Sequence, residues 1–153
     1  MAHDLMQVDP HNKSRYELNL KSFKEQLTQL NAQLKPELKV LKSKKYFVFH
    51  DAYGYFESYY GLNHQGAFDL SGSVSPGAKH LAELREQLEQ AGSSCLFTES
   101  AVRERLAYTL THGLDVHMVE LDPLGYNLSV KPASYSEFLT GLSHRMSSCL
   151  QNL

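Results

Sequence analysis

The stretch that most constrains the fold is YFVFHDAYGYFE, residues 46–57. Its first four residues are apolar, and a short apolar run is typical of a strand buried on both faces, as in a parallel sheet. The polar pair His50-Asp51 follows, and the residues up to Gly61 predict a short helix with Asp51 as N-cap. Ligands bind parallel sheets outside the carboxyl ends of the strands, so His50 lies where a metal-binding imidazole is expected. The alternative is a half-buried histidine bonded to a backbone carbonyl.

The rest of the sequence predicts a long helix followed by strands that alternate with helices. Apolar residues recur every three or four positions from Tyr16 to Leu41, which indicates one long amphipathic helix, disturbed at Pro36, or a coiled coil. We expect an α/β fold: a four-stranded, mostly parallel sheet flanked by helices and preceded by the long helix. The predicted strands are residues 46–49, 64–70, 95–98 and 116–121.

Three helices after these strands have predicted starting points. Ser75-Pro76 and Ser100 are expected to begin the second and third, and Ser134 with Glu137 to form a capping box at the last.

Composition and missing motifs exclude several classes of function. The length of 153 residues is typical of one domain, and a net charge of −2 with scattered basic residues does not suggest a nucleic-acid partner. The sequence lacks an apolar run of about 18 residues, so we expect no direct membrane insertion. The opening MAHDLMQVDPHNK lacks the pattern of a signal peptide. HExxH, GxSxG, Walker and GxGxxG motifs do not occur, which argues against an enzyme.

Three residues that can bind a metal or a proton follow predicted strands: His50, Glu99 and Asp122. They would face one crevice, because the carboxyl ends of parallel strands meet at one edge of the sheet. Taken alone the set is a weak indication, because zinc prefers about four ligands. It would also suit a small metal-dependent hydrolase. The two cysteines, Cys95 and Cys149, lack CxxC spacing, and from the residues alone two free buried thiols are the default interpretation.

Several segments resemble the ZnuA-type zinc-binding proteins, the periplasmic receptors of ABC zinc importers in a class that also carries manganese. The similar segments occur in order over residues 10–150: VFHDAYGYFE, VSPGAKHLAELREQL, CLFTE, LDPLG, SYSEFL and SSCL. The resemblance implies that residues 46–153 form the C-terminal lobe of a receptor. Residues 1–45 would be the end of an N-lobe helix and the linker helix between the lobes. It also implies metal binding rather than catalysis, in the periplasm, with an ABC permease as partner.

The resemblance also assigns roles to individual residues. His50 matches a zinc-binding histidine, and Asp122 matches a position where the wider class places a carboxylate ligand, although ZnuA-like members often do not use it directly. Glu99 matches a recurrent acidic position, which suggests that it orients a ligand or caps the next helix. Cys95 and Cys149 match the cysteine pair of the family, so the resemblance implies a disulfide. A histidine at position 50 favours Zn²⁺ over Mn²⁺, because nitrogen ligands suit zinc.

In the family, further histidine ligands come from an N-terminal lobe, to which nothing in this sequence corresponds. We therefore expect an incomplete zinc site whose missing ligands would come from an N-terminal lobe or a second chain. An alternative is a metal-independent assembly or relict domain in which the long helix pairs two chains. A tyrosine cluster is expected in the core and at the lobe interface: Tyr53, Tyr55, Tyr59 and Tyr60. The remaining histidines are expected to be solvated or hydrogen-bonded within the fold.

Overall fold

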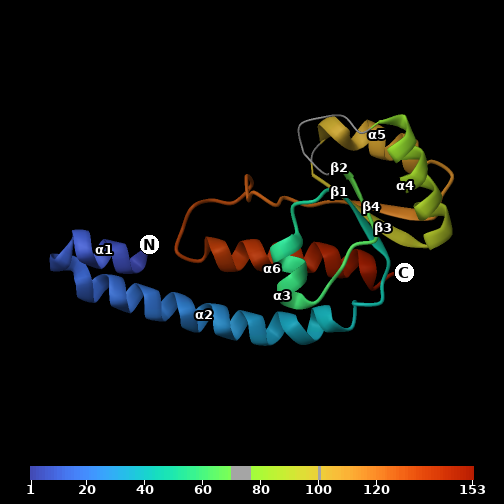
Figure 1. Ribbon diagram of the computed structural model, residues 1–153. Coiled ribbons are helices and arrows are strands. Elements are labelled where there is room, and N and C mark those ends of the chain that lie inside the picture. Colours follow the sequence, from blue (N-terminus) through green and yellow to red (C-terminus); the bar gives the residue numbers. More distant parts are fainter. Residues whose placement is uncertain (70–76, 100) are drawn as a thin grey trace.

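The computed structural model describes residues 1–69, 77–99 and 101–153, and the side chains of all of these except residues 69 and 101–105. Figure 1 shows the α/β class that the sequence predicts, with a long helix ahead of the sheet. The elements are α1 (Ala2–Val8), the 3₁₀ turn η1 (Pro10–Asn12), α2 (Lys13–Lys39), β1 (Tyr46–His50), α3 (Gly54–Tyr60), β2 (Ala67–Asp69), α4 (Ala78–Ala91), β3 (Ser94–Thr98), α5 (Ala101–Thr111), β4 (Val116–Glu120) and α6 (Ser134–Leu150). The predicted helix starts at Ser75-Pro76 and Ser100 fall outside the described residues.

The sheet is parallel at every strand pairing and has the order β2-β1-β3-β4. Tyr46 lies opposite Cys95 in the pairing of β1 with β3, and Phe97 lies opposite Val119 in the pairing of β3 with β4. The carboxyl ends of β1, β3 and β4 therefore lie side by side along one edge. This confirms the predicted sheet and brings the three candidate residues that follow these strands to the same edge.

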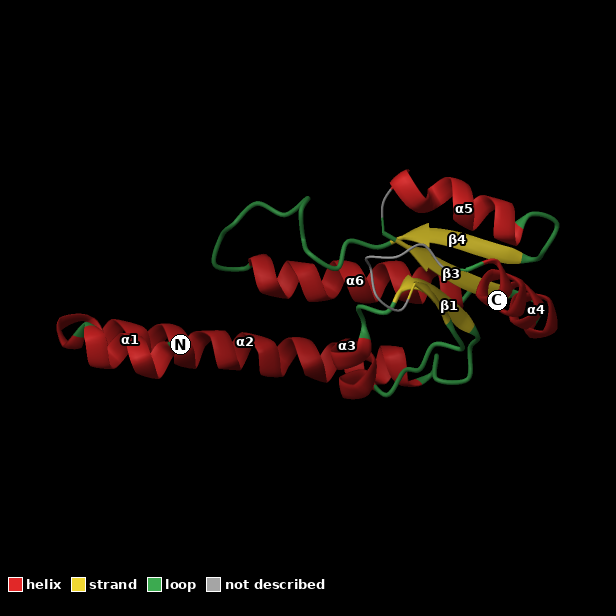
Figure 2. Cartoon of the chain, turned by 45° about the horizontal axis from the view of Figure 1, so that its top comes forward, coloured by secondary structure: helices red, strands yellow, loops and turns green. Residues whose placement is uncertain are grey.

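Helices cover both faces of the sheet, because the side chains of each buried strand alternate between two cores. Tyr46 and Val48 of β1 face a core that includes residues from α2, α3 and α6. Phe47 and Phe49 face the opposite core, which is closed by α4 and α5. Figures 1 and 2 show α4 and α5 on one side of the sheet and α6, α3 and α2 on the other.

The long helix α2 is continuous, so the predicted disturbance at Pro36 is wrong. Its 27 residues correspond to about 40 Å of helix. Pro36 lies in the last turn, where it removes a single backbone hydrogen bond, and its neighbours Leu34 and Leu38 are both buried in the core. α2 runs beside α6, and α1 folds back against the end of α2 that is remote from the sheet (Figure 1). Among the described helices, none combines the length and apolar character that a bilayer crossing requires.

A disulfide joins Cys95 of β3 to Cys149 of α6, with an Sγ–Sγ distance of 2.02 Å and 6.3 Å between the Cα atoms. The pairing implied by the resemblance is therefore present. It fastens the last helix to the centre of the sheet.

Two of the predicted helix caps are wrong. α3 begins at Gly54 with Tyr53 as its N-cap, two residues after the predicted N-cap Asp51, although it ends as predicted at Gly61, whose φ is 73°. At α6, Ser134 is already helical, and its hydroxyl donates to the Ser129 carbonyl and accepts from the Lys131 amide, at 2.7 Å in each case. The preceding loop thus uses the hydroxyl that a capping box would need.

Candidate metal site

His50 is the last residue of β1 and presents its ring at the carboxyl edge of the sheet. The four preceding residues of the strand are buried, whereas the His50 side chain is 36% exposed. Backbone pairing on both sides of β1 fixes the position from which the ring projects. An imidazole held by a buried strand and open to solvent has the placement that a metal ligand requires.

Glu99, the residue after β3, contacts this imidazole. The Nδ1 atom of His50 lies 3.2 Å from Glu99 Oε2, and Nδ1 donates to this carboxylate oxygen. The other carboxylate oxygen, Oε1, accepts a hydrogen bond of 3.2 Å from the hydroxyl of Tyr53. A carboxylate on one ring nitrogen leaves the other, Nε2, as the ring atom that can bind a metal, and it fixes the ring orientation.

Asp122 also lies at this edge, two residues beyond the end of β4, but its carboxylate is directed to the loop that follows. Oδ2 accepts a hydrogen bond of 3.1 Å from the backbone amide of Asn127. Slight burial acts to raise the pKa of Asp122. Hydrogen bonds from the backbone amides of residues 124–127 outweigh this effect, so the pKa is lowered. The carboxylate therefore stays ionised, and it stabilises the turn that begins at Pro123.

Tyr53 connects the carboxylates of this edge electrostatically. Its side chain is buried, and burial is the main reason that the pKa of its hydroxyl is raised. The negative charges of Glu99, Asp122 and Glu57 raise this pKa further. The Tyr53 hydroxyl thus keeps its proton and can donate it to Glu99 in a hydrogen bond.

The described side chains do not complete a metal site by themselves. They contain no group of three or more histidine, cysteine, aspartate or glutamate residues arranged to hold an ion. Of the three predicted residues, His50 and Glu99 are in contact, whereas Asp122 shares their edge and is hydrogen-bonded to its own loop. The arrangement can offer one oriented imidazole nitrogen and, at the same edge of the sheet, the ionised carboxylate of Asp122.

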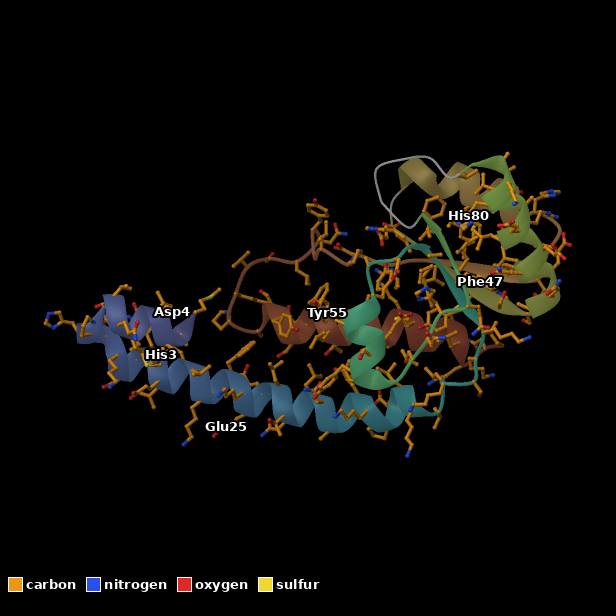
Figure 3. All side chains as sticks on the ribbon, in the orientation of Figure 1. His3, Asp4, Glu25, Phe47, Tyr55 and His80 are labelled. Carbon is orange, nitrogen blue, oxygen red and sulfur yellow. A yellow bond between two sulfur atoms is a disulfide. The ribbon has the colours of Figure 1, made fainter. Side chains whose placement is uncertain are left out.

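Sequence reasoning missed the role of Tyr53 as the second partner of Glu99. It grouped Tyr53 with three other tyrosines, but the structure separates them: Tyr53 and Tyr60 are buried, and Tyr59 is 52% exposed. Tyr55, labelled on α3 in Figure 3, is 98% exposed. All four line a groove of about 500 Å³ between α2, α3 and α6. The available signal for Tyr53 was its place in the short connection from His50 to α3.

Comparisons with known proteins agree with this fold. The profile of the ZnuA family, described as "Zinc-uptake complex component A periplasmic", matches residues 1–149. The chain is 39% identical over 150 residues to the high-affinity zinc uptake system protein ZnuA of Yersinia pestis, covering 97% of this chain and 47% of the relative. It is 35% identical to the protein of the same name from Haemophilus ducreyi, covering 92% of this chain and 46% of the relative. A crystal structure of ZnuA superposes with a TM-score of 0.82 at 26% identity, over 97% of this chain and 55% of that one.

A parallel α/β sheet with a histidine at its carboxyl edge, oriented by a carboxylate, has the arrangement of a ligand-binding protein. More specifically, the chain belongs to the ZnuA family of zinc-uptake components. It spans about half of the length of the relatives that it matches.

Proposed function

We propose that this chain is the C-terminal lobe of a zinc-binding receptor and that His50 binds Zn²⁺ through Nε2. The observation that supports this most strongly is the 3.2 Å contact between His50 Nδ1 and Glu99 Oε2. In zinc proteins, a ligating histidine characteristically donates its other N–H to a carboxylate, which fixes the ring and increases its basicity. In this proposal Glu99 orients the ligand, and Tyr53 holds Glu99.

Asp122 is the proposed second contributor at the same edge. Its hydrogen bonds from backbone amides keep the carboxylate ionised, as a metal ligand must be. The remaining ligands would come from an N-terminal lobe or from a second chain, since zinc is usually held by four ligands. We prefer Zn²⁺ to Mn²⁺ because an imidazole ligand suits zinc better.

The proposed organisation divides the chain at the start of β1. Residues 1–45 would be the end of an N-lobe helix and the linker helix, and residues 46–153 would be the lobe that carries the site. The relatives are named as zinc uptake proteins, and the family profile is described as periplasmic. By analogy, the lobe would work in the periplasm and deliver its ion to an ABC permease.

Zinc titration by calorimetry tests the proposal. Complete structural zinc sites contribute about 10–16 kcal/mol, so a site with half of the ligands should bind with a Kd of about 1–200 μM. His50→Ala should abolish this binding, and Glu99→Gln should weaken it about 10-fold through loss of ring orientation. His80→Ala is the matched control, because His80 is also half-buried but donates to the Ala67 carbonyl, 3.2 Å away, on a different part of the sheet.

Light scattering in the same samples decides where the missing ligands come from. Binding that depends on His50 and leaves the chain monomeric supports an open half site. Tight binding accompanied by dimerisation would mean that a second copy completes the site. Equal zinc binding by wild type and His50→Ala would refute the proposed role of His50, and dimerisation without zinc would favour the assembly function.

A further inference from the structure

Glu57 of α3 is a buried carboxylate at the centre of a cluster that lies apart from His50 and Asp122. Its Oε1 atom accepts a hydrogen bond of 2.5 Å from the Tyr46 hydroxyl at the start of β1. The Nδ1 atom of His64, in the connection from α3 to β2, lies 2.9 Å from Oε1 and 3.0 Å from Oε2. One carboxylate therefore joins a strand, a helix and a loop.

We propose that Tyr46, Glu57 and His64 form a protonation-dependent latch that holds α3 against β1. The latch is tightest when His64 carries a proton and Glu57 does not, and it loosens when either group is neutral. Ion pairs and hydrogen bonds to charged groups are stronger than those between neutral groups, especially in a buried position. The proposal concerns the protein without any bound metal and does not depend on the zinc site.

The backbone hydrogen bonds of Glu57 explain how a change at its side chain can affect the whole of α3. The Glu57 carbonyl accepts from the amides of both Gly61 and Leu62, at 2.7 Å and 2.9 Å, and its amide donates to Tyr53 at 2.9 Å. The backbone of Glu57 is therefore hydrogen-bonded to residues at both ends of this short helix. A helix of seven residues is too short to be stable without tertiary contacts, so its packing depends on anchors of this kind.

The carboxylates near His64 favour its protonated form. Its hydrogen bond to Glu57 is the main cause of a raised pKa of His64, burial opposes this, and the charges of Glu57 and Asp51 raise the pKa further. Burial acts to raise the pKa of Glu57, but the hydrogen bonds from His64 and Tyr46 outweigh it, and the pKa is lowered. Lys42, from the turn after α2, lies close to Gly61. Tyr53 is a further titratable group near the latch, because the charge of Glu57 contributes to the raised pKa of its hydroxyl.

The pH range in which the latch is strongest follows from the raised pKa of His64 and the lowered pKa of Glu57. Because folding raises the pKa of His64, its contribution is complete below its ordinary pKa of 6.5 and is lost as the pH rises through the higher folded value. Glu57 is held ionised, so its contribution is complete above its ordinary pKa of 4.5 and is lost as the pH falls through the lower folded value. The latch is therefore strongest between these two ordinary values.

Hydrogen exchange read by mass spectrometry on the full chain tests the latch. The peptide that covers residues 53–62 should lose about 10-fold in protection between pH 5.8 and pH 8.5, after correction for the intrinsic exchange rate. A peptide covering β3 should not follow this change. His64→Gln keeps a donor that does not titrate, so its α3 protection should be independent of pH.

The matched control is His80→Gln, which removes another half-buried histidine and should keep the wild-type dependence. Persistence of the dependence in His64→Gln, or an equal loss of protection in β3, would overturn the proposal. NMR titration of the His64 ring in the wild-type chain gives a test without any variant. The expected midpoint lies above 6.5, and a midpoint at or below that value would also overturn the proposal.

Discussion

Removing the disulfide between Cys95 and Cys149 should destabilise the fold by an amount that depends on the length of the loop that it closes. The two cysteines are separated by 54 positions, and closing a loop of that length removes about 4 kcal/mol of conformational entropy from the unfolded chain at 25 °C. For a domain of this size, that loss corresponds to a fall in Tm of about 8–16 °C. Because both cysteines are buried, replacing their side chains would add a packing loss to the entropic one.

Reduction separates the entropic contribution from the packing contribution, because it breaks the S–S bond but leaves both cysteine side chains in place. Wild type refolded in reductant should lose about 4 kcal/mol in urea unfolding followed by circular dichroism, and Cys95→Ala with Cys149→Ala should lose more. The m-value should rise in both cases, because an unfolded chain without the link is more expanded. A loss below about 1 kcal/mol on reduction, with an unchanged m-value, would refute the reasoning from loop entropy.

Two further substitutions test the packing of the long helix and the support of the candidate site. Leu38→Ala, at a fully buried position in the last turn of α2, should cost about 2–5 kcal/mol in urea unfolding. Leu18→Ala, on the same helix at a position that is 67% exposed, should change stability by less than about 0.5 kcal/mol. Tyr53→Phe removes the hydroxyl that donates to Glu99; it should cost about 1 kcal/mol in stability and weaken zinc binding measured by calorimetry.

Most of the fold was predictable because its signals are local. The apolar run at the start of β1 fills both cores, so its burial followed from composition alone. Gly61 ends α3 with a positive φ that favours glycine, as expected from its position. The caps at Asp51 and Ser134 failed for a different reason. Their side chains can serve either a helix or the adjoining loop, and only the complete structure decides which.

The sequence predicted which edge of the sheet carries the candidate site, but not which side chains are in contact there. His50 meets Glu99 because β1 lies next to β3, and strand order is not contained in the local pattern of either strand. The residues around Asp122 carry a recognisable turn pattern. An aspartate followed by proline and then by Gly125 is typical of a turn in which the carboxylate binds backbone amides, as it does here with Asn127.

Glu57 and His64 show why buried polar groups are the hardest part of such a prediction. The sequence predicts Glu57 on a short helix among tyrosines and His64 at the start of a strand over residues 64–70, whereas β2 begins only at Ala67 and leaves His64 in the preceding connection. Neither predicted position indicates that the two side chains meet. Their contact depends on how tightly Gly61 turns the chain after α3, which brings residues on either side of the turn to within 2.9 Å. A buried carboxylate is costly unless it is paired, so the turn, the histidine and the tyrosine hydroxyl must be present together. The same dependence makes the latch sensitive to a single proton on either partner.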